Sequence, residues 1–171
     1  MKAKPLLVGA IAVAFAAPAA AQVAVLDPLS MRLLVAHNQE RAVIGVAPLQ
    51  WDPTLAAGAA AHARTLALSG RMQHSPRESR RGQRENLWMG TRSAFSPEQM
   101  VGSWIAEKRM FRPGIFPAVS ATGNWLDVSH YTTMIWRTTA RVGCAIGKGR
   151  SMDFLVCRYS PPGNIDGVAV P

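Results

Sequence analysis

The chain has 171 residues, of which 49% are hydrophobic and 17% are charged, and its formal net charge is +9 at pH 7. This length fits one globular domain with a substantial core, and it excludes a large multidomain assembly within the chain. Two cysteines allow a single pairing, which excludes a small scaffold held together by several disulfides.

The first residues are typical of a secretory signal peptide. The basic stretch Met1–Lys4 precedes an apolar run from Leu6 to Ala17, and the small residues Ala19–Ala21 follow. This order predicts that residues 1–21 are a signal peptide cleaved after Ala21. An uncleaved anchor is the alternative, but the run is shorter than the roughly 20 residues of a membrane-spanning helix. We therefore expect a secreted or periplasmic protein in which residues 22–171 form one domain, with no transmembrane segment after cleavage.

Three helix starts share one pattern, in which a capping side chain stands directly before a proline. The pairs are Asp27-Pro28, Asp52-Pro53 and Ser96-Pro97. Glycines after the first two helices and Pro113 after the third provide the stops. The predicted helices are 28–44, 53–69 and 97–110.

Strand-forming residues are confined to short segments. The predicted strands are 85–89, 132–136, 141–146 and 154–159. The last two flank a glycine-containing turn and predict a β-hairpin. In an oxidising compartment its two cysteines, Cys144 and Cys157, are expected to form a disulfide across the two strands. Helices beside a small antiparallel sheet make the fold class α+β.

Two connecting regions allow more than one interpretation. Residues 111–125 form a long connection, which is either a binding loop or a segment packed over the core. Arginines gather between Arg71 and Arg92, where they suit either an anionic partner or a solvated loop. No aromatic residues alternate with them, so no specific nucleic-acid binding is expected. The tail after Gly167 is expected to be frayed.

The common hydrolase and nucleotide-binding motifs are absent from the sequence. There is no HExxH, G-x-S-x-G, P-loop or G-x-G-x-x-G. Four histidines remain as candidates for chemistry. His37 on the first helix is expected to be a core residue, and His62 on the second to lie near the surface.

Several short segments, taken in order, resemble a known family. His74-Ser75 is followed by Glu85-Asn86-Leu87 and then by Trp104-x-x-Glu107. His130-Tyr131-Thr132 leads to Trp136, and Cys157-x-Tyr159 leads to Gly163-Asn164. This series, across residues 29–164, resembles the CAP superfamily of cysteine-rich secretory proteins, antigen 5 and pathogenesis-related class 1 proteins, including its bacterial SCP-domain members.

The resemblance implies a three-layer α–β–α sandwich with a cleft lined by two histidines and two acids. In this sequence they are His74, Glu85, Glu107 and His130. The histidines are the candidate metal ligands, with zinc held weakly, because two imidazoles are a small ligand set. Arg84 departs from the family pattern, which has glycine there, so its backbone angles are in question. The alternative interpretation is that the four residues form a polar network whose hydrogen bonds are made among its own members and which binds no ligand.

The family resemblance implies three kinds of function. The first is binding of a lipid or sterol-like molecule, and the second is interaction of a basic surface with a cell-envelope polymer. The third is zinc-dependent, protease-like hydrolysis with Glu85 or Glu107 as the catalytic base. We expect a monomeric binding module rather than an enzyme. The candidate lipid-binding residues, which could equally anchor their loop on the core, are Phe111, Ile115, Phe116 and Val119.

Overall fold

The computed structural model describes residues 26–171, so the predicted signal peptide lies outside the described part. A four-stranded sheet, ordered β1-β4-β5-β2, forms the middle layer. The long strands β2 (Arg84–Thr91) and β4 (Arg141–Lys148) each pair antiparallel with β5 (Met152–Ser160), and the short β1 (Gln50–Trp51) pairs with β4 in parallel.

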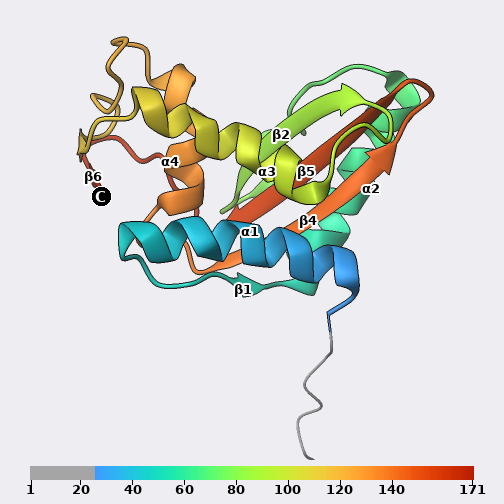
Figure 1. Ribbon diagram of the computed structural model, residues 1–171, viewed down its shortest axis with the longest axis horizontal. Coiled ribbons are helices and arrows are strands. Elements are labelled where there is room, and N and C mark those ends of the chain that lie inside the picture. Colours follow the sequence, from blue (N-terminus) through green and yellow to red (C-terminus); the bar gives the residue numbers. More distant parts are fainter. Residues whose placement is uncertain (1–25) are drawn as a thin grey trace, which may run out of the picture.

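Helices cover both faces of this sheet, giving the three-layer α–β–α sandwich (Figure 1). The helix α2 (Pro53–Ser69) packs on one face, and α1 (Pro28–Ile44), α3 (Pro97–Ile105) and α4 (Ser129–Ile135) pack on the other. Because both faces are covered, β5 is buried along nearly its whole length.

Alternate residues of β5 belong to two separate clusters of the core. Phe154 and Val156 pack with the alanine-rich face of α2. Leu155 and Tyr159 point the other way, into the larger cluster beneath α1 and α3. Cys144 and Cys157 stand opposite each other in the hairpin register and form the expected disulfide.

The predicted helix starts are confirmed at all three positions. Asp27 and Asp52 accept hydrogen bonds from backbone N–H groups of the first turns of α1 and α2. Ser96 and Gln99 form a reciprocal capping box at α3. The third helix is shorter than predicted, since its α-helical part ends at Ile105 and a 3₁₀ segment, η2 (Ala106–Met110), continues it.

Two predictions about secondary structure were wrong. Residues 132–136, read as a strand, lie mostly in α4 because tertiary contacts outweigh the β propensity of Thr132, Thr133 and Ile135. The tail is not frayed, because β6 (Ala169–Val170) pairs with β3 (Gly114–Ile115). This pairing fastens the 111–125 connection to the end of the chain.

A buried arginine joins α1 to the far end of the sheet. Arg41 is fully buried and donates hydrogen bonds to the carbonyl oxygens of Ala47, Met134, Trp136 and Thr139. Burial lowers the pKa of this guanidinium to about 10. Three of these bonds satisfy carbonyl oxygens in the last turn of α4 and just beyond it, and so position that helix, which carries one of the candidate site residues.

Candidate functional site

A cavity of about 230 Å³ brings together three of the four predicted cleft residues, His74, Glu85 and His130. His74 lies between α2 and the 3₁₀ turn η1 (Arg77–Arg80), Glu85 lies on β2, and His130 lies in the first turn of α4. Glu107, in η2, is not among the lining residues and lies behind His130. The remaining lining residues are Arg77, Arg80, Arg84, Asn86, Trp125, Leu126, Ser129 and Thr133.

Glu85 is completely occupied by its neighbours. Its Oε1 accepts hydrogen bonds from His74 Nδ1 at 2.9 Å and from the Ser75 backbone N–H at 3.0 Å, and its Oε2 accepts one from Ser75 Oγ at 2.7 Å. Arg158 Nε lies 3.4 Å from Oε2, and Arg80 Nε lies 4.0 Å from Oε1. Burial by itself would raise the pKa of Glu85, but the bonds from His74 and Ser75 outweigh it and lower that pKa to about 2.

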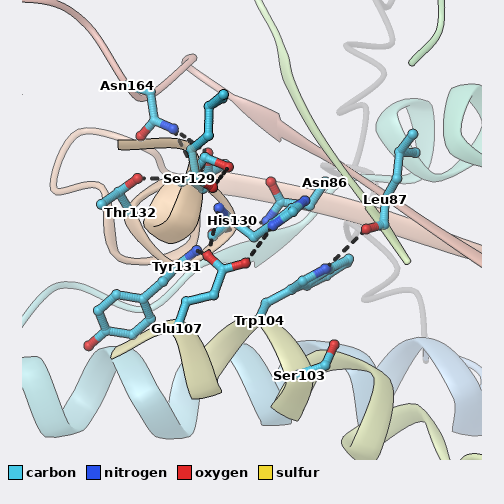
Figure 2. Close-up of polar contacts among 12 residues, drawn as sticks. Asn86, Leu87, Ser103, Trp104, Glu107, Ser129, His130, Tyr131, Thr132 and Asn164 are labelled. Carbon is cyan, nitrogen blue, oxygen red and sulfur yellow. Dashed lines mark hydrogen bonds and ion pairs between the residues drawn. The ribbon is translucent and has the colours of Figure 1, made fainter. Parts of the chain in front are cut away.

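Glu107 holds His130 and the start of α4 at the same time (Figure 2). Its Oε1 accepts a hydrogen bond from His130 Nδ1 at 2.6 Å. Its Oε2 accepts bonds from the backbone N–H groups of His130 and Tyr131, each at 3.0 Å. A carboxylate there satisfies N–H groups of the first helical turn and complements the helix dipole.

The ring of His130 is also fixed from the side. The indole of Trp104 stacks on it, with ring centres 5.9 Å apart and planes inclined by 11°. Trp104 Nε1 donates to the carbonyl oxygen of Leu87, which anchors the indole to β2 (Figure 2). The imidazole of His130 is therefore preorganised by a carboxylate, a helix and an aromatic plane.

The two histidines share one arrangement, in which Nδ1 donates to a carboxylate. In the neutral form of each ring this leaves the lone pair on Nε2, and within residues 26–171 neither Nε2 has a hydrogen-bond partner. Metal-ligating histidines are commonly oriented by a carboxylate in this way. His74 and His130 line the same cavity, and imidazole nitrogens are donors of the type that a divalent metal such as zinc accepts.

A second group of potential ligands does not form a metal site. His37, Cys144 and Cys157 lie close together, but the two sulfurs are joined in the disulfide. Both ring nitrogens of His37 are engaged, by the Leu33 carbonyl oxygen at 2.7 Å and the Tyr159 hydroxyl at 2.8 Å. The expectation that His37 is a core residue is confirmed.

Several supporting residues were missed by the sequence analysis. Ser75 makes two hydrogen bonds to Glu85, and its signal was its place directly after His74. Asn86 Nδ2 donates to the carbonyl oxygen of His130 at 3.0 Å and so joins β2 to α4. His62 is buried, contrary to expectation, because its Nε2 bonds to the carbonyl oxygen of Gln73 and fixes the segment before His74.

The predicted lipid-binding residues lie away from this cavity. Phe111, Phe116 and Val119 are buried in the larger core cluster, and only Ile115 is exposed. Phe116 packs edge-on against Trp125 and Trp136. This packing fits the alternative interpretation, in which these residues anchor the loop on the core.

Arg84 adopts ordinary strand geometry, so the doubt about its backbone angles is removed. Among residues 26–171 only Ser93 and Asn164 are non-glycine residues with positive φ. The guanidinium of Arg84 donates to the carbonyl oxygens of Gly163 at 2.7 Å and Asn164 at 2.6 Å. Asn164 in turn donates to the carbonyl oxygen of Ser129, beside His130.

Sequence comparisons find the same family along most of the chain. The family model described as "Cysteine-rich secretory protein family" matches residues 34–159. A pathogenesis-related protein of PR-1 type from Sambucus nigra is 35% identical over 133 residues, covering 77% of this chain and 75% of that protein. Pathogenesis-related protein 1C from Nicotiana tabacum is 37% identical over 136 residues, covering 78% and 76%.

Solved structures share the fold at lower identity. The crystal structure of NaASP2 with Zn²⁺ matches with a TM-score of 0.69 and 22% identity, over 84% of this chain and 85% of that one. Venom allergen-like protein 4 from Schistosoma mansoni matches with a TM-score of 0.66 and 18% identity, over 85% and 97%. Among residues 26–171, no helix has the length and hydropathy needed to cross a membrane.

Proposed function

Because the chain belongs to the cysteine-rich secretory protein family, we propose that it is an exported binding protein whose cleft holds a divalent metal ion between His74 and His130. Its ligand would be a lipid or sterol-like molecule or a cell-envelope partner. The predicted signal peptide and the disulfide are consistent with a secreted or periplasmic location.

One observation carries the metal-binding part of this proposal. Each histidine donates Nδ1 to its own carboxylate, which leaves both Nε2 lone pairs available for a ligand. When bound, a zinc ion would supply a Lewis-acidic centre with open coordination positions. The chain itself contributes the orientation of the two rings and a basic wall formed by Arg77, Arg80 and Arg84.

Binding is favoured over zinc-dependent hydrolysis by the state of the two acids. A general base needs a carboxylate oxygen within reach of the proton that it removes. Both oxygens of Glu85 and both of Glu107 already accept hydrogen bonds from neighbouring residues. The two acids therefore act as positioning residues for the histidines in this proposal.

A role for the 111–125 loop in lipid binding would depend on Ile115 and on opening of the loop. Phe116 and Val119 would have to leave the core to contact a ligand, and this would cost the free energy of their burial. We therefore propose the cleft and its arginine wall, rather than this loop, as the ligand-binding surface.

The test is zinc binding measured by isothermal titration calorimetry on the chelator-treated mature protein. His74→Ala and His130→Ala are each expected to weaken zinc binding by about tenfold or more, because one of two protein ligands is removed. His62→Gln is the matched control, since the glutamine amide can still donate to the Gln73 carbonyl oxygen. Zinc affinity that is unchanged in both cleft variants, or weakened equally in the control, would contradict the proposed site.

Hydrolysis is tested on the same preparations. Zinc-loaded protein incubated with a peptide library is expected to give no turnover. Zinc-dependent cleavage that is lost in both Glu85→Ala and Glu107→Ala would contradict the binding-only function. The folded state of each variant is checked by its thermal unfolding midpoint.

A further inference from the structure

A second hollow adjoins the histidine cavity and is dominated by arginine. Its volume is about 280 Å³, and Arg77, Arg80 and Arg84 line both spaces, so these side chains form the wall between them. The remaining residues of the second hollow are Arg81, Gly82, Gln83, Pro162, Gly163 and Ile165. Four guanidinium groups thus surround one concave surface.

The acids near these arginines offset only part of their positive charge: Glu85 Oε1 lies 4.0 Å from Arg80 Nε, and the negative charge of Asp166 acts on Arg84. Arg84 is held by two carbonyl oxygens, and Arg80 Nε donates to the Ser75 carbonyl oxygen at 3.1 Å. Arg77 and Arg81 form no ion pair with any carboxylate of residues 26–171. Glu85, the nearest acid to Arg80, is already occupied by His74 and Ser75.

Arg84 is also preorganised. Its Nε and Nη2 atoms are fixed on the β5–β6 connection, and its Nη1 has no partner among residues 26–171. Burial lowers the pKa of Arg84, the positive charges of Arg80 and Arg77 lower it further, and the negative charge of Asp166 opposes them. A bound anion would relieve the repulsion among the arginines, and the side chain of Arg84 would not have to be reordered to bind it.

Exposed apolar side chains stand at the edges of the two hollows. Ile165 lines the arginine hollow and is 45% exposed, and Leu126 lines the histidine cavity and is 58% exposed. An amphiphile with an anionic head could place its head among the guanidinium groups and its apolar part against these residues. Arginine is well suited to phosphate because its planar donors match the phosphate oxygens in pairs.

We propose that Arg77, Arg80, Arg81 and Arg84 form a binding site for the phosphate group of a lipid headgroup. This proposal names the class of ligand for the binding function proposed above. It rests on that function only in assuming that the ligand is bound and not chemically converted. It does not require the metal. Arg84 is central to it, because its side chain lines both hollows and its guanidinium is held by the carbonyl oxygens of Gly163 and Asn164.

The experiment measures co-sedimentation of the mature protein with vesicles. The vesicles contain 30% phosphatidylglycerol in phosphatidylcholine, with pure phosphatidylcholine as the neutral reference. The double variant Arg77→Gln/Arg81→Gln changes only exposed side chains and is expected to weaken binding about 30-fold, at about 1 kcal/mol for each arginine near the surface.

Arg64→Gln/Arg150→Gln is the matched control, because it removes the same charge from a different hollow beside the β4–β5 turn. It is expected to change binding less than twofold. An equal loss in both double variants would overturn the proposal, since it would show that only net charge matters.

Two further arms identify the source of the phosphate. Competition by glycerol 3-phosphate would show that the headgroup alone is sufficient. If glycerol 3-phosphate does not compete and Ile165→Ser weakens vesicle binding, the apolar edge is also needed. If the protein binds neither the vesicles nor glycerol 3-phosphate, the proposal is overturned. Binding to dextran sulfate alone would also overturn it, because it would identify a polyanionic glycan as the ligand.

Failure of this proposal is distinguishable from failure of the metal site. The arginine double variant is expected to retain the zinc affinity of the parent protein. His130→Ala is expected to retain vesicle binding. Each readout therefore responds to one set of residues.

Discussion

Replacing Glu85 by glutamine is expected to lower the free energy of unfolding by about 3–5 kcal/mol, because the change leaves a buried charge without its partner. The side chain of Glu85 is fully buried, and that of Arg158, 3.4 Å away, is only 6% exposed. Glutamine preserves the shape of the side chain and removes its charge. The loss would therefore report on the ion pair and on the hydrogen bond to the lost carboxylate oxygen, rather than on a cavity.

Glu98 provides the matched control for this substitution. Its pKa is also lowered to about 2, chiefly by the hydrogen bond from Arg32. The two side chains of this pair are 47% and 51% exposed, so water screens their interaction. Glu98→Gln is therefore expected to cost less than about 1 kcal/mol.

The assay is equilibrium unfolding in urea, monitored by tryptophan fluorescence in zinc-free buffer. The double variant Glu85→Gln/Arg158→Met is expected to recover part of the loss, because it removes the uncompensated guanidinium. A cost for Glu85→Gln no larger than that for Glu98→Gln would refute the reasoning. A double variant no more stable than Glu85→Gln would refute it as well.

Three further predictions concern stability. Burial lowers the pKa of His37 from 6.5 to about 4, so between these pH values the unfolded chain binds a proton that the folded protein does not. The free energy of unfolding should therefore fall by up to about 3 kcal/mol as the pH is lowered from 6.5 to 4. Urea titrations in which His37→Gln kept the same pH dependence would contradict this assignment. A methyl group at Gly143 would overlap the backbone of α2, so Gly143→Ala should lower the free energy of unfolding by several kcal/mol. Gly102 lies in open space within α3, so Gly102→Ala should raise the free energy of unfolding by about 0.5–1 kcal/mol. Thermal unfolding that ranked the two variants in the opposite order would refute this packing. Replacing both Cys144 and Cys157 by serine should lower the free energy of unfolding by about 3 kcal/mol, since the disulfide closes a short loop. An unchanged midpoint of urea unfolding without reductant would show that the bond does not constrain the unfolded chain.

Short-range sequence patterns predicted most of the secondary structure. The starts of α1, α2 and α3 were readable because the capping groups Asp27, Asp52 and Ser96 act within a few residues of their own position. The hairpin and its disulfide were readable for the same reason. The start of α4 was not, since its first N–H groups bond to Glu107, more than 20 residues earlier.

The candidate site was predictable in composition but not in geometry. Family resemblance supplied His74, Glu85, Glu107 and His130, and the structure pairs each histidine with one acid. Neither pairing could be derived from spacing, because each depends on how separate elements pack. The same limit applies to Phe116, whose apolar side chain suited either a ligand or the core until the tertiary packing was known.

The double role of Glu107 restricts how this protein can change over evolutionary time. One oxygen of this carboxylate orients His130, and the other caps the helix that carries it. A mutation of Glu107 that released the ring would also remove the cap of the helix. Selection for a stable fold would therefore preserve Glu107, and with it the orientation of His130, even in a lineage whose ligand had changed.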